Sequence, residues 1–284
     1  MISYIHHHHA GNFADVLKHA VLCACLEHLL KKPAPVHYLD THAGAGRYRL
    51  QRAAPDAPAE IDTGALRLLD AADAPPVLAP YLAQLAAARR GASLDHYPGS
   101  PLLAARLLRA DDRLALWELH PEDHRRLARL FRGDRRVQVH RADGPEAMPA
   151  LLPTPGRRAL VLIDPPYEHQ AEYRAVEHAL LAGLARMPSA VALAWYPLMA
   201  AQPARAMVAR LGRKLTAPTL VVEFEQWRTG DAPGMGGCGL LVVNPPWTLA
   251  DGLEHALPWL VRTLGAHGAG QRQLVAERPA ANRR

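Results

Sequence analysis

ALVLIDPPY, residues 159–167, is the stretch of sequence that decides the fold. Its first five residues are apolar, which is typical of a strand buried on both faces of a parallel sheet. Two prolines then remove amide donors that a strand needs, so the strand must end at the acid that precedes them. The sequence therefore predicts an acidic side chain at the carboxyl end of a strand, where open α/β sheets bind their ligands.

Strands of this kind alternate with helices along much of the chain. Helices are predicted over 12–32, 121–131, 170–186 and 249–264, with shorter ones near 145–152 and up to about 212. Six more strands complete the pattern: 36–40, 113–119, 136–140, 190–197, 219–227 and 239–247. This alternation predicts an α/β fold with a mostly parallel seven-stranded sheet. The last two strands have no helix between them, so the final strand is expected to be antiparallel.

Residues 50–97 interrupt the alternation with a stretch of Ala, Pro and Leu, in which we expect a small helical insertion. The main domain then comprises residues 1–49 and 98–265, and the polar residues 266–284 are expected to form a loose C-terminal tail. The insertion ends in a YPGSP turn. Within this turn Ser100 is a suitable N-cap for the next helix, with Pro101 at the first helical position.

Composition limits the classes of function. The chain has 284 residues, 49% of them hydrophobic, which is enough for one large α/β domain or two small ones. Its formal net charge of +6 is compatible with a polyanionic partner, although many basic proteins bind no nucleic acid. Three cysteines do not form a disulfide framework, which favours the cytoplasm. No apolar run approaches the roughly 20 residues that span a membrane, and the N-terminus lacks the apolar core of a signal peptide.

A glycine-containing loop, DTHAGAG (40–46), follows the first predicted strand. Glycines at this place let the backbone approach a ligand closely, although a simple turn would also use them. A dinucleotide site would carry G-x-G-x-x-G, and here Tyr48 and Arg49 stand where the third glycine should follow. The form D-x-x-A-G-x-G instead resembles the cofactor loop of S-adenosylmethionine-dependent methyltransferases, which we favour over a nicotinamide enzyme.

Two further acidic residues follow the next strands. A carboxylate at Glu118 can accept hydrogen bonds from both hydroxyls of a ribose, or it is a solvated acid at a strand end. Asp143 can accept a hydrogen bond from the amino group of an adenine, and Gly144 would leave clearance for the ring. The alternative interpretation of this pair is an ordinary Asp-Gly turn.

The DPPY segment (residues 164–167) has a chemistry of its own. The carboxylate of Asp164 and the carbonyl of Pro165 can together accept both hydrogens of a planar amino group. These contacts draw the nitrogen lone pair out of conjugation and direct it at a methyl donor. Tyr167 can stack on the base and fix its plane. A proline-rich turn is the alternative, but it does not account for this tetrapeptide at the end of this strand.

A second segment, NPPW (residues 244–247), has the same general pattern. It follows the strand that should run antiparallel. The end of that strand would lie at the opposite edge of the sheet, away from the loop at 40–46. We therefore interpret NPPW as structural.

The N-terminal segment contains four consecutive histidines, 6–9, and leads into a helix capped by Asn12. A fragment of a purification tag is one interpretation, but a tag is usually longer and separate from the fold. A metal cluster is another, but no set of acids or cysteines with ligand spacing accompanies the histidines, so no metal site is predicted. Contact of aromatic, histidine and lysine side chains with bases and phosphates of a nucleic acid is the third.

These segments together resemble the RlmJ family of bacterial 23S ribosomal RNA adenine-N6 methyltransferases. The matching segments run in family order over nearly the whole chain: SY-x-H-x-x-HAGN-x-ADVLKH (3–19), YLDTHAGAGRY (38–48), YPGSP (97–101), ELHP (118–121), DG (143–144), LIDPPYE (162–168), WYP (195–197) and NPPW (244–247). The resemblance implies a Rossmann-like class I methyltransferase domain with a helical insertion. It implies transfer of one methyl group from S-adenosylmethionine to adenine 2030 of 23S rRNA.

The resemblance also assigns roles by matched position. It implies cofactor contacts from His19, His42, Ser100, Glu118, Asp143, Gly144 and Asp164. It implies that Tyr4, His6 and Lys18 face the RNA, and that Asp164 accepts an amino hydrogen. The chain departs from the family pattern in the inserted region and at His7 and His8.

We expect a cytoplasmic monomer that acts on 23S rRNA without an obligate protein partner or a membrane. Two alternatives stay open at this point. A DNA adenine methyltransferase uses the same tetrapeptide chemistry. A non-catalytic RNA-binding module would keep the basic charge, but it would need neither the glycines nor the carboxylates.

Overall fold

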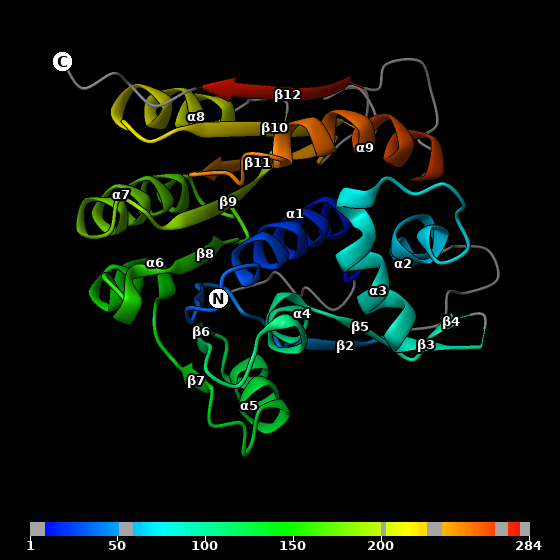
Figure 1. The fold of residues 1–284 in the computed structure, drawn as a ribbon, viewed down its shortest axis with the longest axis horizontal. Helices are drawn as coiled ribbons and strands as arrows, with labels where there is room; N and C mark the ends of the chain where they lie inside the picture. The colour runs from blue at the N-terminus through cyan, green and yellow to red at the C-terminus, as the bar shows by residue number, and fades with distance from the viewer. Residues whose placement is uncertain are drawn as a thin grey trace.

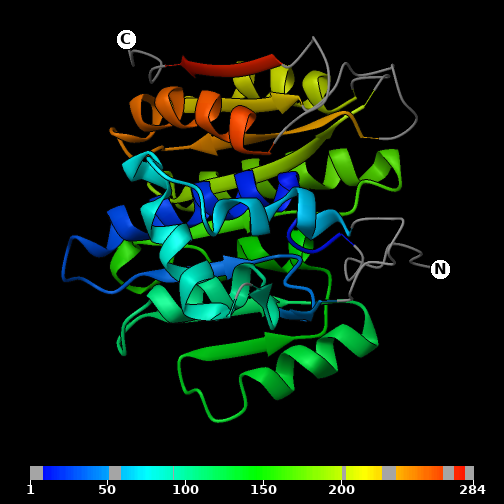
Figure 2. The same ribbon diagram turned by 90° about the vertical axis from the view of Figure 1, so that its right-hand side faces the viewer.

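A computed structural model describes residues 9–50, 59–91, 93–199, 203–225, 235–264 and 272–278. Its centre is an eight-stranded sheet with the order β12-β10-β11-β9-β8-β1-β6-β7. The strands follow one another in this order from the top to the bottom of Figures 1 and 2. Their bounds are β1 His37–Asp40, β6 Arg113–Trp117, β7 Val137–His140, β8 Ala159–Ile163, β9 Val191–Leu198, β10 Thr219–Glu225, β11 Gly237–Val243 and β12 Arg272–Arg278.

The five strands β9, β8, β1, β6 and β7 are parallel. β1 lies at the centre of this half, with Asp40 paired to Leu116 of β6 on one side and to Leu162 of β8 on the other. The segments that follow β1, β6 and β8 therefore leave the sheet at the same edge. This register brings the loop at 40–46, Glu118 and the DPPY segment to one place, as the sequence predicts.

The other end of the sheet is antiparallel. β11 pairs antiparallel with both β9 and β10, so the last predicted strand runs in the expected direction. All seven predicted strands are present. An eighth, β12, pairs antiparallel with β10 and corrects the expectation of a loose tail for residues 272–278. Without β12 the strand β10 would be an uncovered edge, and pairing satisfies its outward backbone groups.

The described part of the main domain has seven α-helices. They are α1 Phe13–Leu30, α4 Ser100–Leu107, α5 Pro121–Leu130, α6 Gly144–Ala147, α7 Gln170–Arg186, α8 Pro203–Lys214 and α9 Leu249–Leu264. Helix α1 begins as predicted, because the side chain of Asn12 accepts hydrogen bonds from the amides of Ala14 and Asp15. Helices α6, α7 and α8 pack one apolar cluster against one face of the sheet. Helices α1, α4 and α9 pack another against the opposite face. Figure 1 shows these two helical layers on either side of the strands.

The insertion packs beside α1, at the right of Figure 1. It contains α2 Glu60–Thr63, two 3₁₀ turns (Ala65–Leu68 and Pro76–Leu78), α3 Ala79–Ala88 and a short hairpin of β3 Arg89–Arg90 and β4 Ser93–Leu94. A two-stranded ribbon of β2 (Arg47–Arg49) and β5 (His96–Pro98) frames it. This ribbon was not predicted, since three-residue strands leave no periodic signal. It holds the two ends of the insertion together beside the loop at 40–46.

Two local details of the fold bear on the site. Gly99, not Ser100, precedes the first residue of α4 and takes the N-cap position, so the expectation that Ser100 is the N-cap was wrong by one residue. The hydroxyl of Ser100 instead donates to Asp40.

Among the residues that the structure describes, no helix has the length and apolar character needed to cross a membrane.

Candidate functional site

A cavity of about 1150 Å³ opens at the carboxyl ends of the parallel strands. Its walls come from α1, from the loop after β1, from the starts of α4 and α5, from the turn before α6, and from the segment between β8 and α7. All the described residues that the sequence singles out for cofactor or substrate line it or lie against it. The cavity thus joins chain segments more than 100 residues apart.

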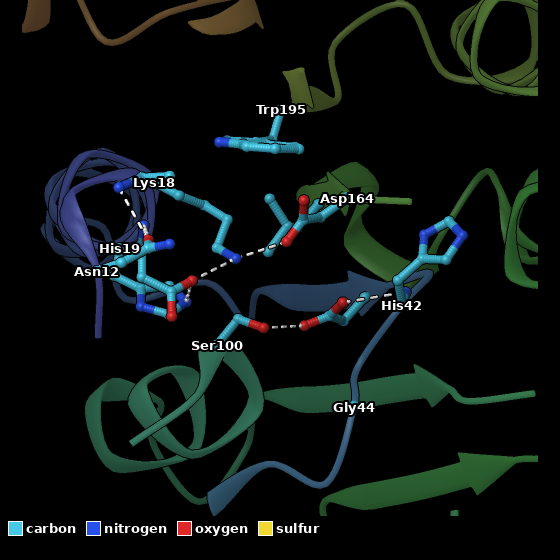
Figure 3. A network of polar contacts seen from close by, with 12 residues as sticks. Asn12, Lys18, His19, His42, Gly44, Ser100, Asp164 and Trp195 are labelled. Carbon is cyan, nitrogen blue, oxygen red and sulfur yellow. Dashed lines mark hydrogen bonds and ion pairs between the residues drawn. The ribbon is translucent and has the colours of Figure 1, made fainter. Parts of the chain in front are cut away.

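The loop after β1 is anchored by Asp40, whose side chain is fully buried. The hydroxyls of Tyr38 and Ser100 both donate to its Oδ2 at 2.7 Å. The backbone N–H of His42 donates to its Oδ1. Burial raises the pKa of Asp40 to about 6, against the opposing effect of these three donors. Figure 3 shows Ser100 reaching this carboxylate below the site.

Glycine is required at position 44 for two reasons. Gly44 has a φ of +59°, and a Cβ there would lie 2.0 Å from the hydroxyl oxygen of Tyr48. The resulting turn points the N–H of Gly44 at Oε2 of Glu118, at 2.8 Å, while the N–H of His120 donates to Oε1 at 2.6 Å. Burial raises the pKa of Glu118, and these two amide donors oppose that rise.

Asp143 and Gly144 also line the cavity, and Gly144 lies directly against Thr41 of this loop. Asp143 caps α6, since its Oδ1 accepts from the N–H of Glu146. A Cβ on Gly144 would lie 2.2 Å from the carbonyl oxygen of Thr41. The need for glycine here therefore comes from contact with the Thr41 backbone. Clearance for a ligand ring, which the sequence suggested for Gly144, is not needed to explain it.

His42 lies at the inner wall of the cavity. Its Nδ1 is 2.8 Å from the hydroxyl of Thr41. Burial lowers the pKa of His42 to about 4, although the carboxylates of Asp164 and Asp143 act in the other direction. The imidazole is therefore neutral at physiological pH and offers one donor and one acceptor.

Lys18 links helix α1 to the DPPY segment. Its ammonium lies 2.5 Å from Oδ2 of Asp164 and 2.7 Å from Oδ1 of Asp15. Burial alone would lower the pKa of Lys18, but the two carboxylates outweigh it and raise that pKa well above its usual value. Lys18 therefore stays charged, and it lies inside the cavity rather than on the outer surface (Figure 3). Contact between Lys18 and RNA stays a prediction.

His19 follows Lys18 on α1 but faces the insertion. Its Nδ1 is 2.7 Å from the hydroxyl of Tyr97, which is 2.9 Å from the hydroxyl of Tyr81. Its Nε2 is 4.0 Å from Asp15. This buried chain of polar groups ties α1 to α3 and β5. A cofactor contact from His19 stays a prediction.

The DPPY segment leaves β8 in a sharply turned conformation. Tyr167 has a φ of +54°, which is unusual for a residue with a side chain. Its hydroxyl donates to the carbonyl oxygen of Trp195 at 2.7 Å, and its ring centroid is 4.4 Å from that of Tyr173. Tyr167 is therefore held in a single orientation beside Asp164, while the ring of Trp195 lies 6.1 Å away.

The NPPW segment lies elsewhere, as predicted. The side-chain amide of Asn244 donates to the carbonyl oxygens of Pro188 and Ala190, at 2.8 and 2.7 Å, next to the start of β9. Trp247 is 82% exposed. None of the four residues of NPPW lines the cavity.

Three residues of the site were not predicted from the sequence: Asp15, Asp40 and Trp195. Asp15 is three residues before Lys18 on one helix, a spacing at which the two side chains meet. Asp40 carries a signal in its place as the first residue of the glycine loop. Trp195 begins the WYP segment (195–197) that matches the family, but a tryptophan within an apolar strand is usually a core residue. Tyr4 and His6, which the resemblance assigns to RNA, lie outside the described residues, as do His7 and His8.

The donor and acceptor set of the cavity fits S-adenosylmethionine. Glu118 keeps a lone pair on each oxygen beyond the amides it already accepts, which suits the two hydroxyls of a ribose. Oδ2 of Asp143 has no hydrogen-bond donor among the described residues, which suits an amino group. A metal ion is not favoured by the same criterion. Within the described ranges no group of three or more His, Cys, Asp or Glu side chains could hold one.

Comparisons with known proteins agree with this geometry. A family model described as "Ribosomal RNA large subunit methyltransferase D, RlmJ" matches residues 33–276. The chain belongs to the RlmJ family. A protein of Escherichia coli named ribosomal RNA large subunit methyltransferase J is 40% identical over 270 residues, covering 95% of this chain and 96% of its own. Its namesake in Haemophilus influenzae is 41% identical, with the same coverage.

The RlmJ family assignment extends to solved structures. A crystal structure of a Legionella pneumophila protein superposes with a TM-score of 0.85 and is 31% identical, covering 96% of this chain and 99% of its own. This chain is therefore a methyltransferase of the RlmJ family with a Rossmann-like class I fold. The family and the fold together imply use of S-adenosylmethionine.

Proposed function

We propose that this enzyme transfers a methyl group from S-adenosylmethionine to the exocyclic N6 of an adenine in 23S rRNA, which by family resemblance is adenine 2030. We further propose that it acts in the cytoplasm as a monomer, without an obligate protein partner. Its homologues carry the name of a large-subunit ribosomal RNA methyltransferase. The observation that carries the proposal is the position of Asp164, at a strand end and beside a fixed Tyr167, in the same cavity that Glu118 lines.

The DPPY segment supplies the acceptors that an adenine amino group needs. Asp164 is partly exposed to the cavity, so its carboxylate can accept one amino hydrogen. Pro165 has no N–H, and its carbonyl can accept the other hydrogen without a competing donor on the same residue. The ring of Tyr167 can stack on the base, because the hydrogen bond from its hydroxyl to the carbonyl oxygen of Trp195 fixes its orientation. The adenine must leave its helix or loop to enter the cavity, at a cost of a few kcal/mol.

Lys18 and Asp15 set the charge of this acceptor pair. The ammonium of Lys18 lies against Oδ2 of Asp164, and this contact restricts rotation of the carboxylate. Oδ1 of Asp164 is left for the amino group. When bound, S-adenosylmethionine supplies an activated methyl group on a sulfonium centre. The contribution of the protein is then mainly positioning of the nitrogen and exclusion of water.

His42, Ser100, Glu118, Asp143 and Gly144 form the wall that we assign to the cofactor. Glu118 would hold the ribose and Asp143 the adenine amino group. Ser100 acts through Asp40, which it donates to, and thereby fixes the loop at 40–46. His19 is assigned to the same wall from the family resemblance. Tyr4, His6 and Lys18 are assigned to the RNA in the same way.

A DNA adenine is the alternative acceptor, since the DPPY segment distinguishes an amino group and not the sugar attached to it. The test is transfer of a labelled methyl group to protein-free 23S rRNA lacking the modification, with duplex DNA of similar length in a parallel reaction. We expect about one methyl group per rRNA molecule and none on DNA. Preferential labelling of DNA, or no labelling of rRNA at any Mg²⁺ concentration, would overturn the proposal.

A further inference from the structure

The face formed by helix α5, the turn after it and the end of β7 carries an unusual concentration of arginine. Residues 120–141 contain seven arginines, no lysine and three acidic residues, a formal net charge of +4. The whole chain of 284 residues has a net charge of +6. This face, which we call the α5–β7 face, lies at the lower end of the sheet in Figure 1.

Most of these cations have no carboxylate partner. The three acidic residues of the segment form ion pairs with only two of its arginines. Arg126 pairs with Glu122 and Asp123, and Arg136 pairs with Asp134. Within the part of the chain that the structure describes, the other five arginines make no ion pair. These are the exposed residues Arg125, Arg129, Arg132, Arg135 and Arg141.

Two other groups of basic side chains differ from this face, because their charges are paired or their donors join parts of the fold. In the groove between α7 and α8, Arg210 and Lys214 both pair with Glu177, at 2.9 and 2.6 Å. At the opposite edge of the sheet, Arg158 donates to backbone carbonyls in the last turn of α1 and in the segment after it. Those side chains join separate parts of the fold. On the α5–β7 face, by contrast, Arg125 donates to a carbonyl one turn earlier on its own helix, which leaves its charge without a counter-ion.

The α5–β7 face begins at the rim of the catalytic cavity. Glu118, Leu119 and His120, which precede α5, line that cavity, and so does Ala142, which follows Arg141. Helix α5 then extends about 15 Å away from the rim, at 1.5 Å per residue. Arg125 and Arg129 are one helical turn apart and therefore share a face of this helix. Leu119 is 50% exposed at the rim, where an apolar contact with a base is available.

Protection of a sheet edge is a competing explanation for the charge, because β7 is the last strand of the sheet. That explanation requires charged side chains on the strand. The strand itself, Val137–His140, contains no arginine. The arginines lie on the helix and turns beside it. They present charge outward, which suits a long polyanion better than it suits protection of the strand.

We propose that the α5–β7 face binds the phosphate backbone of the rRNA next to the flipped adenine. The inference rests on the proposed function and adds to it the surface over which the substrate runs. Arginine is suited to this use because its planar fork contacts phosphate oxygens in pairs. Contacts of this kind hold the RNA in register without reading its sequence.

The test compares two double variants that lose the same charge. R125Q/R129Q removes two unpaired cations of the α5–β7 face. K31Q/K32Q removes two exposed lysines just past the end of α1, at the opposite edge of the sheet. Methylation of protein-free 23S rRNA is measured at several salt concentrations, together with cofactor affinity and thermal unfolding.

For R125Q/R129Q we expect a KM for rRNA raised about tenfold at constant salt, with kcat at saturating RNA and cofactor affinity unchanged. The slope of log KM against log salt should fall by about 1.5, at roughly 0.7 to 0.9 for each phosphate that the variant no longer neutralises. K31Q/K32Q should leave KM and slope unchanged.

Equal effects of the two variants, or a wild-type KM and slope for R125Q/R129Q, would overturn the proposal. A normal KM on naked rRNA with a defect only on protein-containing subunit precursors would also overturn it, because the partner would then be a protein. If the wild-type enzyme labels no rRNA, the proposed function fails instead, and the two failures are distinguishable.

Discussion

The DPPY and NPPW segments share two central prolines and an aromatic last residue, and they lie at opposite edges of one sheet. Asp164 ends a strand that is parallel to β1, and its side chain reaches the cavity and Lys18. Asn244 follows a strand that is antiparallel to β9, and its side-chain amide donates hydrogen bonds to two backbone carbonyls. Strand direction, more than the motif, therefore decides which segment can take part in the reaction.

The conformations of the two segments make the same point. Tyr167 and Asn244 both have positive φ, at +54° and +52°, so each segment turns sharply after its strand. In DPPY the turn fixes an aromatic ring beside a carboxylate. In NPPW the turn leaves Trp247 exposed. The positive φ falls on the last residue of DPPY and on the first residue of NPPW, so the two segments leave their strands by different turns.

The largest expected effect comes from removing the acid of DPPY. Asp164→Ala should lower kcat about 10³-fold, because the amino group loses the acceptor that orients it. Cofactor affinity should stay within a few-fold of wild type. Asn244→Ala is the matched control, with kcat unchanged but a free energy of unfolding lower by about 1–3 kcal/mol. Single-turnover methylation and urea unfolding measure both effects, and comparable losses of kcat would break the comparison.

Removing Lys18, the cation of helix α1 that contacts Asp164, should have the next largest effect. Lys18→Met leaves Asp15 and Asp164 together in a buried place without a counter-charge. We expect kcat to fall about 10²-fold and the free energy of unfolding to fall by about 3 kcal/mol. Lys214→Met is the control, since its pair with Glu177 is half exposed and worth less than about 1 kcal/mol. A Lys18→Met enzyme with normal kcat would remove Lys18 from the account.

A smaller effect is expected at the ring of DPPY. Tyr167→Phe keeps the ring but removes the hydrogen bond to the carbonyl of Trp195. We expect a loss of about 1 kcal/mol of stability and a few-fold loss of kcat, because the ring still packs on Tyr173. Tyr173→Phe retains its ring contact and should be silent in both measurements. If Tyr167→Phe abolished turnover, its hydroxyl would have a chemical role that the structure does not assign.

The smallest effect concerns pH. His42 has a folded pKa of about 4 against 6.5 in the unfolded chain, so the unfolded chain binds the extra proton between these values and stability falls as pH falls through that window. His42→Gln removes this contribution. On going from pH 7 to pH 5 the variant should gain about 1 kcal/mol relative to wild type, allowing for the partial exposure of the ring. Urea unfolding at both pH values checks this, and parallel pH profiles would contradict it.

Much of the fold follows from the sequence because it depends on periodicity. The alternation of apolar strands with amphipathic helices fixes the parallel half of the sheet. The sequence shows no helical pattern between 219–227 and 239–247, and this predicts the antiparallel pairing of the two strands. β12 escaped prediction because its short apolar centre is flanked by polar residues. The ribbon of β2 and β5 escaped because its pairing is non-local and its strands have only three residues each.

Site residues could be predicted where the residue type and its position at a strand end were enough to indicate a role. Glu118 and Asp164 are strand-end acids, and both face the cavity. The contacts between elements could not be predicted. Nothing in the sequence indicates that Lys18 of α1 meets Asp164 of the DPPY segment, 146 residues away. The same holds for Ser100 and Asp40, which are 60 residues apart in the sequence and lie on either side of the insertion.

DPPY, and not NPPW, is the segment that we expect to orient one adenine of 23S rRNA for methylation. The most direct measurement is mass mapping of N6-methyladenine in 23S rRNA from cells that lack the gene and carry wild type, Asp164→Ala or Asn244→Ala. We expect the N6-methyladenine that depends on the gene, at adenine 2030, to be restored by wild type and by Asn244→Ala and to be absent with Asp164→Ala. Restoration by Asp164→Ala, or no change at any adenine on loss of the gene, would contradict it.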